Sequence, residues 1–250
     1  MFLRKPSSVV LALIGLAALA GLRLGQAQAA SASQTSADPY AAMAPLDQYM
    51  IADREAEIAL ARSAATASIS GTADVLVLGT SGYTTAAKGT NGFVCLVQRG
   101  WAAATDFPEF WNPKVRAPIC LNAVAARTYL QIILMKTKLV VAGKSKGEIA
   151  EAVKAGLDSG TLPPLEPGAM CYMTAKQQYL NDQAKNWHPH MMWFVPGAAS
   201  ASWGANLPGS PTIGANDPEE RLTIMLVWVG HWSDGTLAPA EDAAPAVHKM

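Results

Sequence analysis

Residues 74–98 read DVLVLGTSGYTTAAKGTNGFVCLVQ, a segment of three β-forming runs separated by turn residues. The runs cover Asp74–Gly79, Tyr83–Ala87 and Phe93–Gln98, and the turn signals are Ser81-Gly82 and Gly89–Gly92. Because the connections are short, we expect three strands in an antiparallel meander. The third run is apolar on both faces at its start, which places it inside the sheet.

Helices and further strands are expected along the rest of the chain. Pro45 opens a predicted amphipathic helix that runs to Ala67, and a second helix is predicted over residues 123–142. A capping box, Ser145-Lys146-Gly147-Glu148, begins a third helix that stops at Gly160. Strands are expected at 169–174, 191–195 and 222–229, and residues 198–216 have the Gly, Ser and Pro content of a loop.

This order of elements predicts an α+β fold. Strands and helices do not alternate regularly, and the Gly-x-Gly-x-x-Gly turn of a dinucleotide site does not occur. We therefore expect an antiparallel or mixed sheet with helices packed on one face, in a single domain over residues 45–232.

The N-terminus has the pattern of a secretion signal. Arg4-Lys5 precedes an apolar run from Val9 to Leu22, and Ala27-Gln28-Ala29 supplies small residues for cleavage. The alternative is an uncleaved membrane anchor. We expect a signal peptide at 1–29, a disordered tether at 30–44 and a flexible tail at 233–250, with a periplasmic or secreted product that has no stable membrane insertion after cleavage.

The charge balance excludes one class of partner. The chain has 19 basic and 19 acidic residues, and loss of Arg4, Lys5 and Arg23 with the leader leaves three more acidic than basic residues. Nucleic acids attract basic patches, and none is visible. We therefore expect no nucleic-acid partner, and a small molecule and an envelope protein both stay open as partners.

Three cysteines enter an oxidising compartment, where paired thiols become disulfides. Cys95 and Cys120 are the closest in sequence and are the preferred pair, because they would close a loop that contains the Pro-rich stretch 107–118. Cys171 is then a buried free thiol. The alternative is three reduced cysteines in the core.

The sequence has no common zinc-binding, phosphate-binding or nucleophile motif, but it has one pattern that could bind a metal. His188 and His190 are separated by one residue, so on an extended chain both rings could reach one transition metal. Third ligands could come from Asp182, His231 or Asp234. The alternative is two histidines in ordinary hydrogen bonds.

A softer version of this site depends on how two strands pair. If the strands around residues 171 and 192 are neighbours, Cys171 and Met173 could share a face with His190 and Met192, a set suited to Cu(I). The alternative is that the methionines fill gaps in the core.

Aromatic residues form two further groups. Trp228, His231 and Trp232 could line a pocket for a small apolar or sugar-like ligand, or could shield the core at the end of a strand. The loop Gly100–Pro118 contains Trp101, Phe107, Phe110 and Trp111, which we interpret as a cover for the sheet.

Several short motifs between about Ala73 and Val229 resemble a group of uncharacterised secreted bacterial proteins. They are Thr90-Asn91-Gly92-Phe93, Cys95-Leu96-Val97, Pro118 with Cys120, Ala126-Arg127-Thr128, Ser145 with Glu148-Ile149, Pro167-Gly168, Tyr172-Met173, and His190-Met191-Met192 with Phe194. The resemblance implies a secreted single domain and supports the pairing of Cys95 with Cys120, but it implies no reaction.

Three functional hypotheses follow from the sequence. The first is an exported, non-enzymatic domain that binds a ligand or a partner, because no complete catalytic set is visible. The second is a metal-binding protein or metal-dependent hydrolase centred on His188 and His190. The third is a structural protein of the cell envelope.

Overall fold

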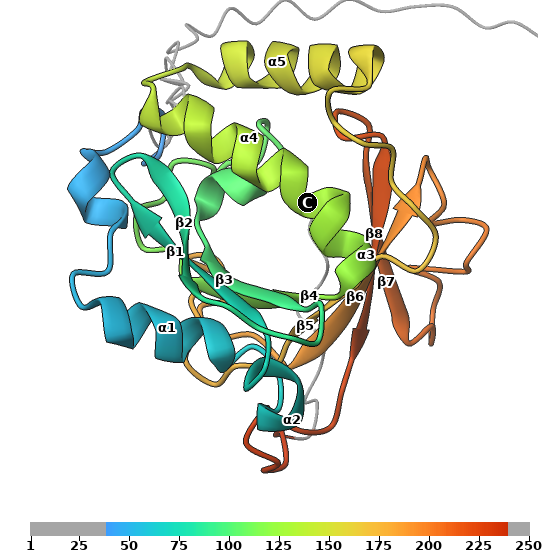
Figure 1. Ribbon diagram of the computed structural model, residues 1–250. Helices are drawn as coiled ribbons and strands as arrows, with labels where there is room; N and C mark the ends of the chain where they lie inside the picture. The colour runs from blue at the N-terminus through green and yellow to red at the C-terminus, as the bar shows by residue number, and fades with distance from the viewer. Residues whose placement is uncertain (1–38, 240–250) are drawn as a thin grey trace, which may run out of the picture. The chain divides into compact units, whose positions relative to one another are not determined.

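The computed structural model describes residues 39–239, and the expected signal peptide, most of the expected tether and residues 240–250 lie outside this range. The fold is α+β, as expected, and is built on one eight-stranded mixed sheet with the order β2-β1-β3-β4-β5-β6-β8-β7 (Figure 1). Its strands are β1 (Asp74–Gly79), β2 (Gly82–Ala87), β3 (Val94–Gln98), β4 (Ala117–Leu121), β5 (Met170–Met173), β6 (His190–Pro196), β7 (Thr212–Asp217) and β8 (Leu222–Trp228).

The first three strands are where predicted, but they do not form a meander. β1 pairs with β2 in antiparallel fashion and with β3 in parallel fashion, so β2 lies at the sheet edge. The link after β2 returns past the start of β1, where Thr90 N donates to Thr72 O at 2.8 Å. A Cβ at Gly89 would lie 2.3 Å from the Thr72 carbonyl oxygen. Glycine therefore permits the close crossing that reverses the direction of β3.

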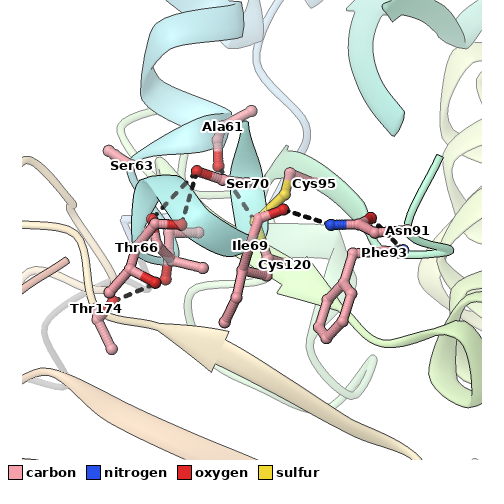
Figure 2. Close-up of a disulfide and its surroundings, with 12 residues drawn as sticks. Ala61, Ser63, Thr66, Ile69, Ser70, Asn91, Phe93, Cys95, Cys120 and Thr174 are labelled. Atoms are coloured by element: carbon pink, nitrogen blue, oxygen red, sulfur yellow. Dashed lines mark hydrogen bonds between the residues drawn. A yellow bond between two sulfur atoms is a disulfide. The ribbon is translucent and has the colours of Figure 1, made fainter. Parts of the chain in front are cut away.

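The disulfide between Cys95 and Cys120 is confirmed, and it connects neighbouring strands. The two residues stand directly opposite each other on β3 and β4. Their side chains lie on the sheet face that packs against α1 (Arg54–Arg62), near Ala61 (Figure 2). The same buried cluster includes Val97. Cys171 is free and buried, as expected.

Helices cover both faces of the sheet. The main core lies between the sheet and three helices, α3 (Ala123–Arg127), α4 (Tyr129–Val141) and α5 (Lys146–Ser159), with α5 packed on α4 (Figure 1). The expected packing of helices on one face therefore holds for α3 to α5, whereas α1 covers the opposite face. The predicted capping box of α5 is present, and Gly160 ends that helix in a left-handed conformation.

The single helix predicted from Pro45 to Ala67 is wrong. The segment forms a 3₁₀ turn at Leu46–Tyr49, then α1, then the short helix α2 (Ala67–Ser70). The Asp53 carboxylate accepts hydrogen bonds from the backbone N–H groups of Glu55 and Ala56, which begins a new helix at Arg54. A buried ion pair at 2.9 Å between Glu57 and Arg99 then fixes α1 on the sheet.

Residues just outside both expected boundaries make specific contacts with the rest of the domain. Tyr40, which was expected in the tether, donates a hydrogen bond to Asp182 at 2.5 Å, and Met43 packs against a buried aromatic cluster. Near the other end, Ser233 N donates to Thr174 O at 2.9 Å within the stretch expected to be a tail. No helix between residues 39 and 239 is long and apolar enough to cross a membrane.

Two loop predictions have different outcomes. The aromatic loop 100–118 covers the sheet as expected, with Trp101, Phe110 and Trp111 buried. The loop expected at 198–216 contains the edge strand β7 instead. Its sequence TIGAND does not alternate between apolar and polar residues, so the pattern did not predict a strand. The segment is held in a strand by its antiparallel pairing with β8.

Candidate functional site

Residues that the sequence assigned to two separate candidate sites meet at one end of β6 and β8. His190 begins β6 and stands opposite Trp228, the last residue of β8. The ring centroids of His188 and Trp228 are 5.4 Å apart, and the Trp187 ring lies 5.2 Å from His190 and 6.0 Å from Trp228. We call these four residues the Trp–His cluster.

His190 is held neutral in this cluster. Its side chain is almost fully buried, and its Nδ1 lies 2.7 Å from the backbone oxygen of His188. A carbonyl can only accept, so Nδ1 carries the proton and Nε2 carries the lone pair. Burial lowers the pKa of His190 to about 4, so the ring is uncharged at neutral pH.

Several polar atoms around the Trp–His cluster have unused hydrogen-bonding capacity. Gln178 Nε2 donates to the backbone oxygen of Trp187 at 2.7 Å. Within residues 39–239, Gln178 Oε1 and the indole N–H groups of Trp187 and Trp228 are buried without a partner. Because buried polar groups in folded proteins are nearly always paired, these atoms would favour a polar group brought in by a bound molecule.

The expected third metal ligands are engaged elsewhere. Asp182 pairs with Lys114 at 2.5 Å and accepts hydrogen bonds from Tyr40 and Tyr179, which together hold the pKa of its carboxyl well below the usual value. Asp234 pairs with Lys176 at 2.7 Å. No three His, Cys, Asp or Glu side chains in the described part of the chain lie close enough to hold a metal ion. The His188–His190 site therefore has no third ligand of these types there.

The three residues of the predicted aromatic pocket differ in their surroundings. Trp228 belongs to the Trp–His cluster, whereas His231 is exposed and Trp232 is buried. His231 forms an antiparallel bridge with Leu237, and Trp232 N donates to Thr236 O at 2.9 Å, so both residues belong to a short hairpin after β8. This arrangement matches a shielded strand end more closely than a shared pocket.

An open groove that the sequence did not indicate lies where α5 and the loop after it meet the ends of β6 and β8. Its volume is about 560 Å³, within the range of sites for small molecules. Apolar side chains supply most of its lining, namely Tyr129, Ile132, Leu157, Leu162, Pro163, Pro164, Leu165, Pro196 and Leu222. Such a lining favours an apolar body in the ligand.

One hydroxyl in the groove is available to a ligand. Tyr129 is 4% exposed, and its ring stacks on Phe194 with centroids 3.8 Å apart. No hydrogen bond to its hydroxyl is found among residues 39–239. Burial raises the pKa of Tyr129 well above 10, so the hydroxyl stays protonated and can donate a hydrogen bond.

The charged residues of the groove are already paired. Glu220 is buried against Lys136, whose Nζ lies 2.7 Å from Glu220 Oε1, and burial raises the pKa of the Glu220 carboxyl. At the rim, Arg221 pairs with Asp158, and both side chains are about half exposed. Because each cation faces an anion, the groove offers no free charge and suits an uncharged ligand.

Sequence patterns could not indicate this groove, because its walls come from four separate segments. The local signals present were Pro163-Pro164, which stiffens one wall, and Glu219-Glu220-Arg221 before β8. Neither has the spacing of a known motif.

Comparison with models of protein families, with curated proteins and with solved structures found no match for this chain. The function is therefore argued from the chemistry of these two regions alone.

Proposed function

We propose that this chain is an exported, non-enzymatic protein that binds a small uncharged amphipathic molecule in the groove beside Tyr129. The observation that carries the proposal is the Tyr129 hydroxyl, which has no hydrogen-bond partner among residues 39–239 and lies in an apolar groove of about 560 Å³. The apolar lining would bury the body of the ligand, and Tyr129 would donate a hydrogen bond to its acceptor. The export is supported by the leader pattern in residues 1–29.

The ligand should be a molecule with a carbonyl or ether oxygen on an apolar body. A donor hydroxyl pairs with an acceptor, and the paired charges of Glu220 and Arg221 give no net attraction for an ion. A ligand with a carboxylate would have to bring that charge out of water and close to the buried Glu220 carboxyl, which is unfavourable.

The test uses the uncharged dye prodan, which has a ketone on an aromatic body and changes its emission when the ketone is hydrogen-bonded. Purified mature protein should bind it saturably. Leu157→Trp, which places a large ring in the groove lining, should abolish binding. Tyr129→Phe removes one hydrogen bond and should weaken binding by about two- to tenfold.

Ala155→Trp is the matched control. Ala155 lies on the same helix as Leu157, is exposed, and does not line the groove. The assignment of the groove would be overturned if Ala155→Trp and Leu157→Trp reduced binding equally, or if neither variant reduced it. Thermal unfolding of each variant confirms that the fold is retained.

A further inference from the structure

Four sulfur and imidazole side chains lie side by side on β5 and β6. Cys171 stands directly opposite Met192, and Met173 stands directly opposite His190. Alternate residues of a strand share a face, so the four side chains form two adjacent pairs on one face of the sheet. Opposed residues have Cβ atoms about 5 Å apart, close enough for the four side chains to reach a common point.

No side chain of this set takes part in a disulfide or an ion pair within residues 39–239. Cys171 is outside the disulfide, and its face of the sheet is opposite to the one on which Cys95 and Cys120 are joined. His190 presents the lone pair of Nε2, because Nδ1 is held by the His188 carbonyl at 2.7 Å. A backbone carbonyl on the far nitrogen is the usual second partner of a metal-binding histidine.

We propose that Cys171, Met173, His190 and Met192 form a binding site for Cu(I). Thiolate and thioether sulfur are soft ligands that select Cu(I), and the set contains no carboxylate oxygen that would favour Mg²⁺ or Ca²⁺. On binding, the Cys171 S–H bond breaks, the Cu–S bond forms and the proton leaves to solvent. No oxidation or reduction takes place.

Charge and burial favour a monovalent metal ion at this position. Cys171, Met173 and His190 are at most 4% exposed, and the surrounding core is apolar. A Cu(I) ion with one thiolate is neutral overall, whereas Zn(II) in the same set would leave a positive charge in the core. Met192 is only partly buried and gives the ion a route to the site.

The test is a competition experiment on untagged mature protein under anaerobic conditions. Ascorbate keeps copper as Cu(I) without opening the disulfide, and bathocuproine disulfonate competes for the ion. We expect one equivalent of Cu(I) to be retained. Cys171→Ala and Met173→Leu should each weaken the affinity by about tenfold or more, a loss of about 1.4 kcal/mol. Cu(I) should also quench the fluorescence of Trp187, whose ring is 5.2 Å from His190.

Two methionines on the other face serve as matched controls. Met191 stands opposite Tyr172 on β5, and Met225 is buried in a separate cluster, so Met191→Leu and Met225→Leu should leave the affinity unchanged. Met192→Leu, at a partly exposed position, should weaken binding with little effect on folding.

Three outcomes would overturn the site: no Cu(I) retained against the competitor, equal losses in the Met191→Leu control, or Zn(II) retained as tightly as Cu(I). X-ray absorption of the loaded protein should show sulfur and nitrogen neighbours, and a purely oxygen shell would equally reject the assignment. Circular dichroism of each variant separates a lost ligand from a lost fold.

Discussion

Reduction of the disulfide should destabilise the protein by an amount that follows from the distance between its cysteines in sequence. Cys95 and Cys120 are separated by 25 residues. A crosslink that closes a loop of this length lowers the entropy of the unfolded chain by about 12 cal/mol/K, which is about 3.5 kcal/mol at 25 °C. For a domain of this size the same change corresponds to a fall in Tm of roughly 10 °C.

The assay is urea unfolding followed by tryptophan fluorescence, with and without excess reductant. The wild type should lose about 3.5 kcal/mol of unfolding free energy on reduction, and its thiol count should rise from one to three. The double variant Cys95→Ala/Cys120→Ala should not respond to the reductant. Cys171→Ala keeps the disulfide and should respond as the wild type does.

The reasoning is refuted by a wild-type midpoint that does not move when thiol titration shows complete reduction. It is refuted equally by three reactive thiols in protein that is purified without reductant and then unfolded, because the crosslink would then not have formed. In either case the two strands would be held by backbone pairing alone.

The outcomes of several further substitutions follow from the surroundings of single residues. Gly89→Ala should lower the free energy of unfolding by more than about 2 kcal/mol, because the new Cβ would meet the backbone of Thr72 and Ala73. Gly147→Ala, in the open first turn of α5, should raise the free energy of unfolding by about 0.5–1 kcal/mol. Urea unfolding measures both changes. Lys136→Met should cost about 3–5 kcal/mol at pH 7 by leaving the Glu220 carboxylate buried without its partner, and adding Glu220→Gln should restore part of the loss. Lys144 and the Ser145 cap lower the pKa of Glu148 to about 2. The contribution of the Glu148 carboxylate to stability is therefore complete above the usual pKa of 4.5 and is lost as the pH falls toward 2. The difference in unfolding free energy between the wild type and Glu148→Gln should shrink over that pH range, and a constant difference would reject the capping role.

Local patterns predicted the elements better than their pairing. The runs at 74–79, 170–173 and 222–228 form strands because a short apolar β-rich run has few other ways to be buried. The capping box predicted the start of α5 because both of its hydrogen bonds lie within four residues. The parallel direction of β3 depends on a crossing against Thr72 and Ala73, which no short pattern in the sequence expresses.

For the candidate sites, too, the sequence suggested residues that are close along the chain but not the contacts that strand pairing creates. Spacing alone suggested that Cys171 and Met173 could face His190 and Met192, and the observed register fulfils the pairing on which that idea depended. Trp228 and His188 were assigned to different sites, because their contact arises only when β6 and β8 pair. The groove could not be anticipated, since α4, α5, a proline-rich loop and the β7–β8 turn each supply part of it.

The sheet itself explains how the Cys171 thiol is kept apart from the Cys95–Cys120 disulfide. On β4, Cys120 stands opposite Tyr172 and Leu121 stands opposite Cys171, so Cys120 and Cys171 differ by one strand position and face opposite sides. A thiolate must approach a disulfide sulfur directly to exchange with it, and the backbone of the sheet lies between the two. Burial also raises the pKa of the Cys171 thiol, which suppresses its reaction with oxidants. The same alternation that protects Cys171 from exchange places it beside Met173, His190 and Met192, so a soft metal ion is the reactant that this thiol is best placed to meet.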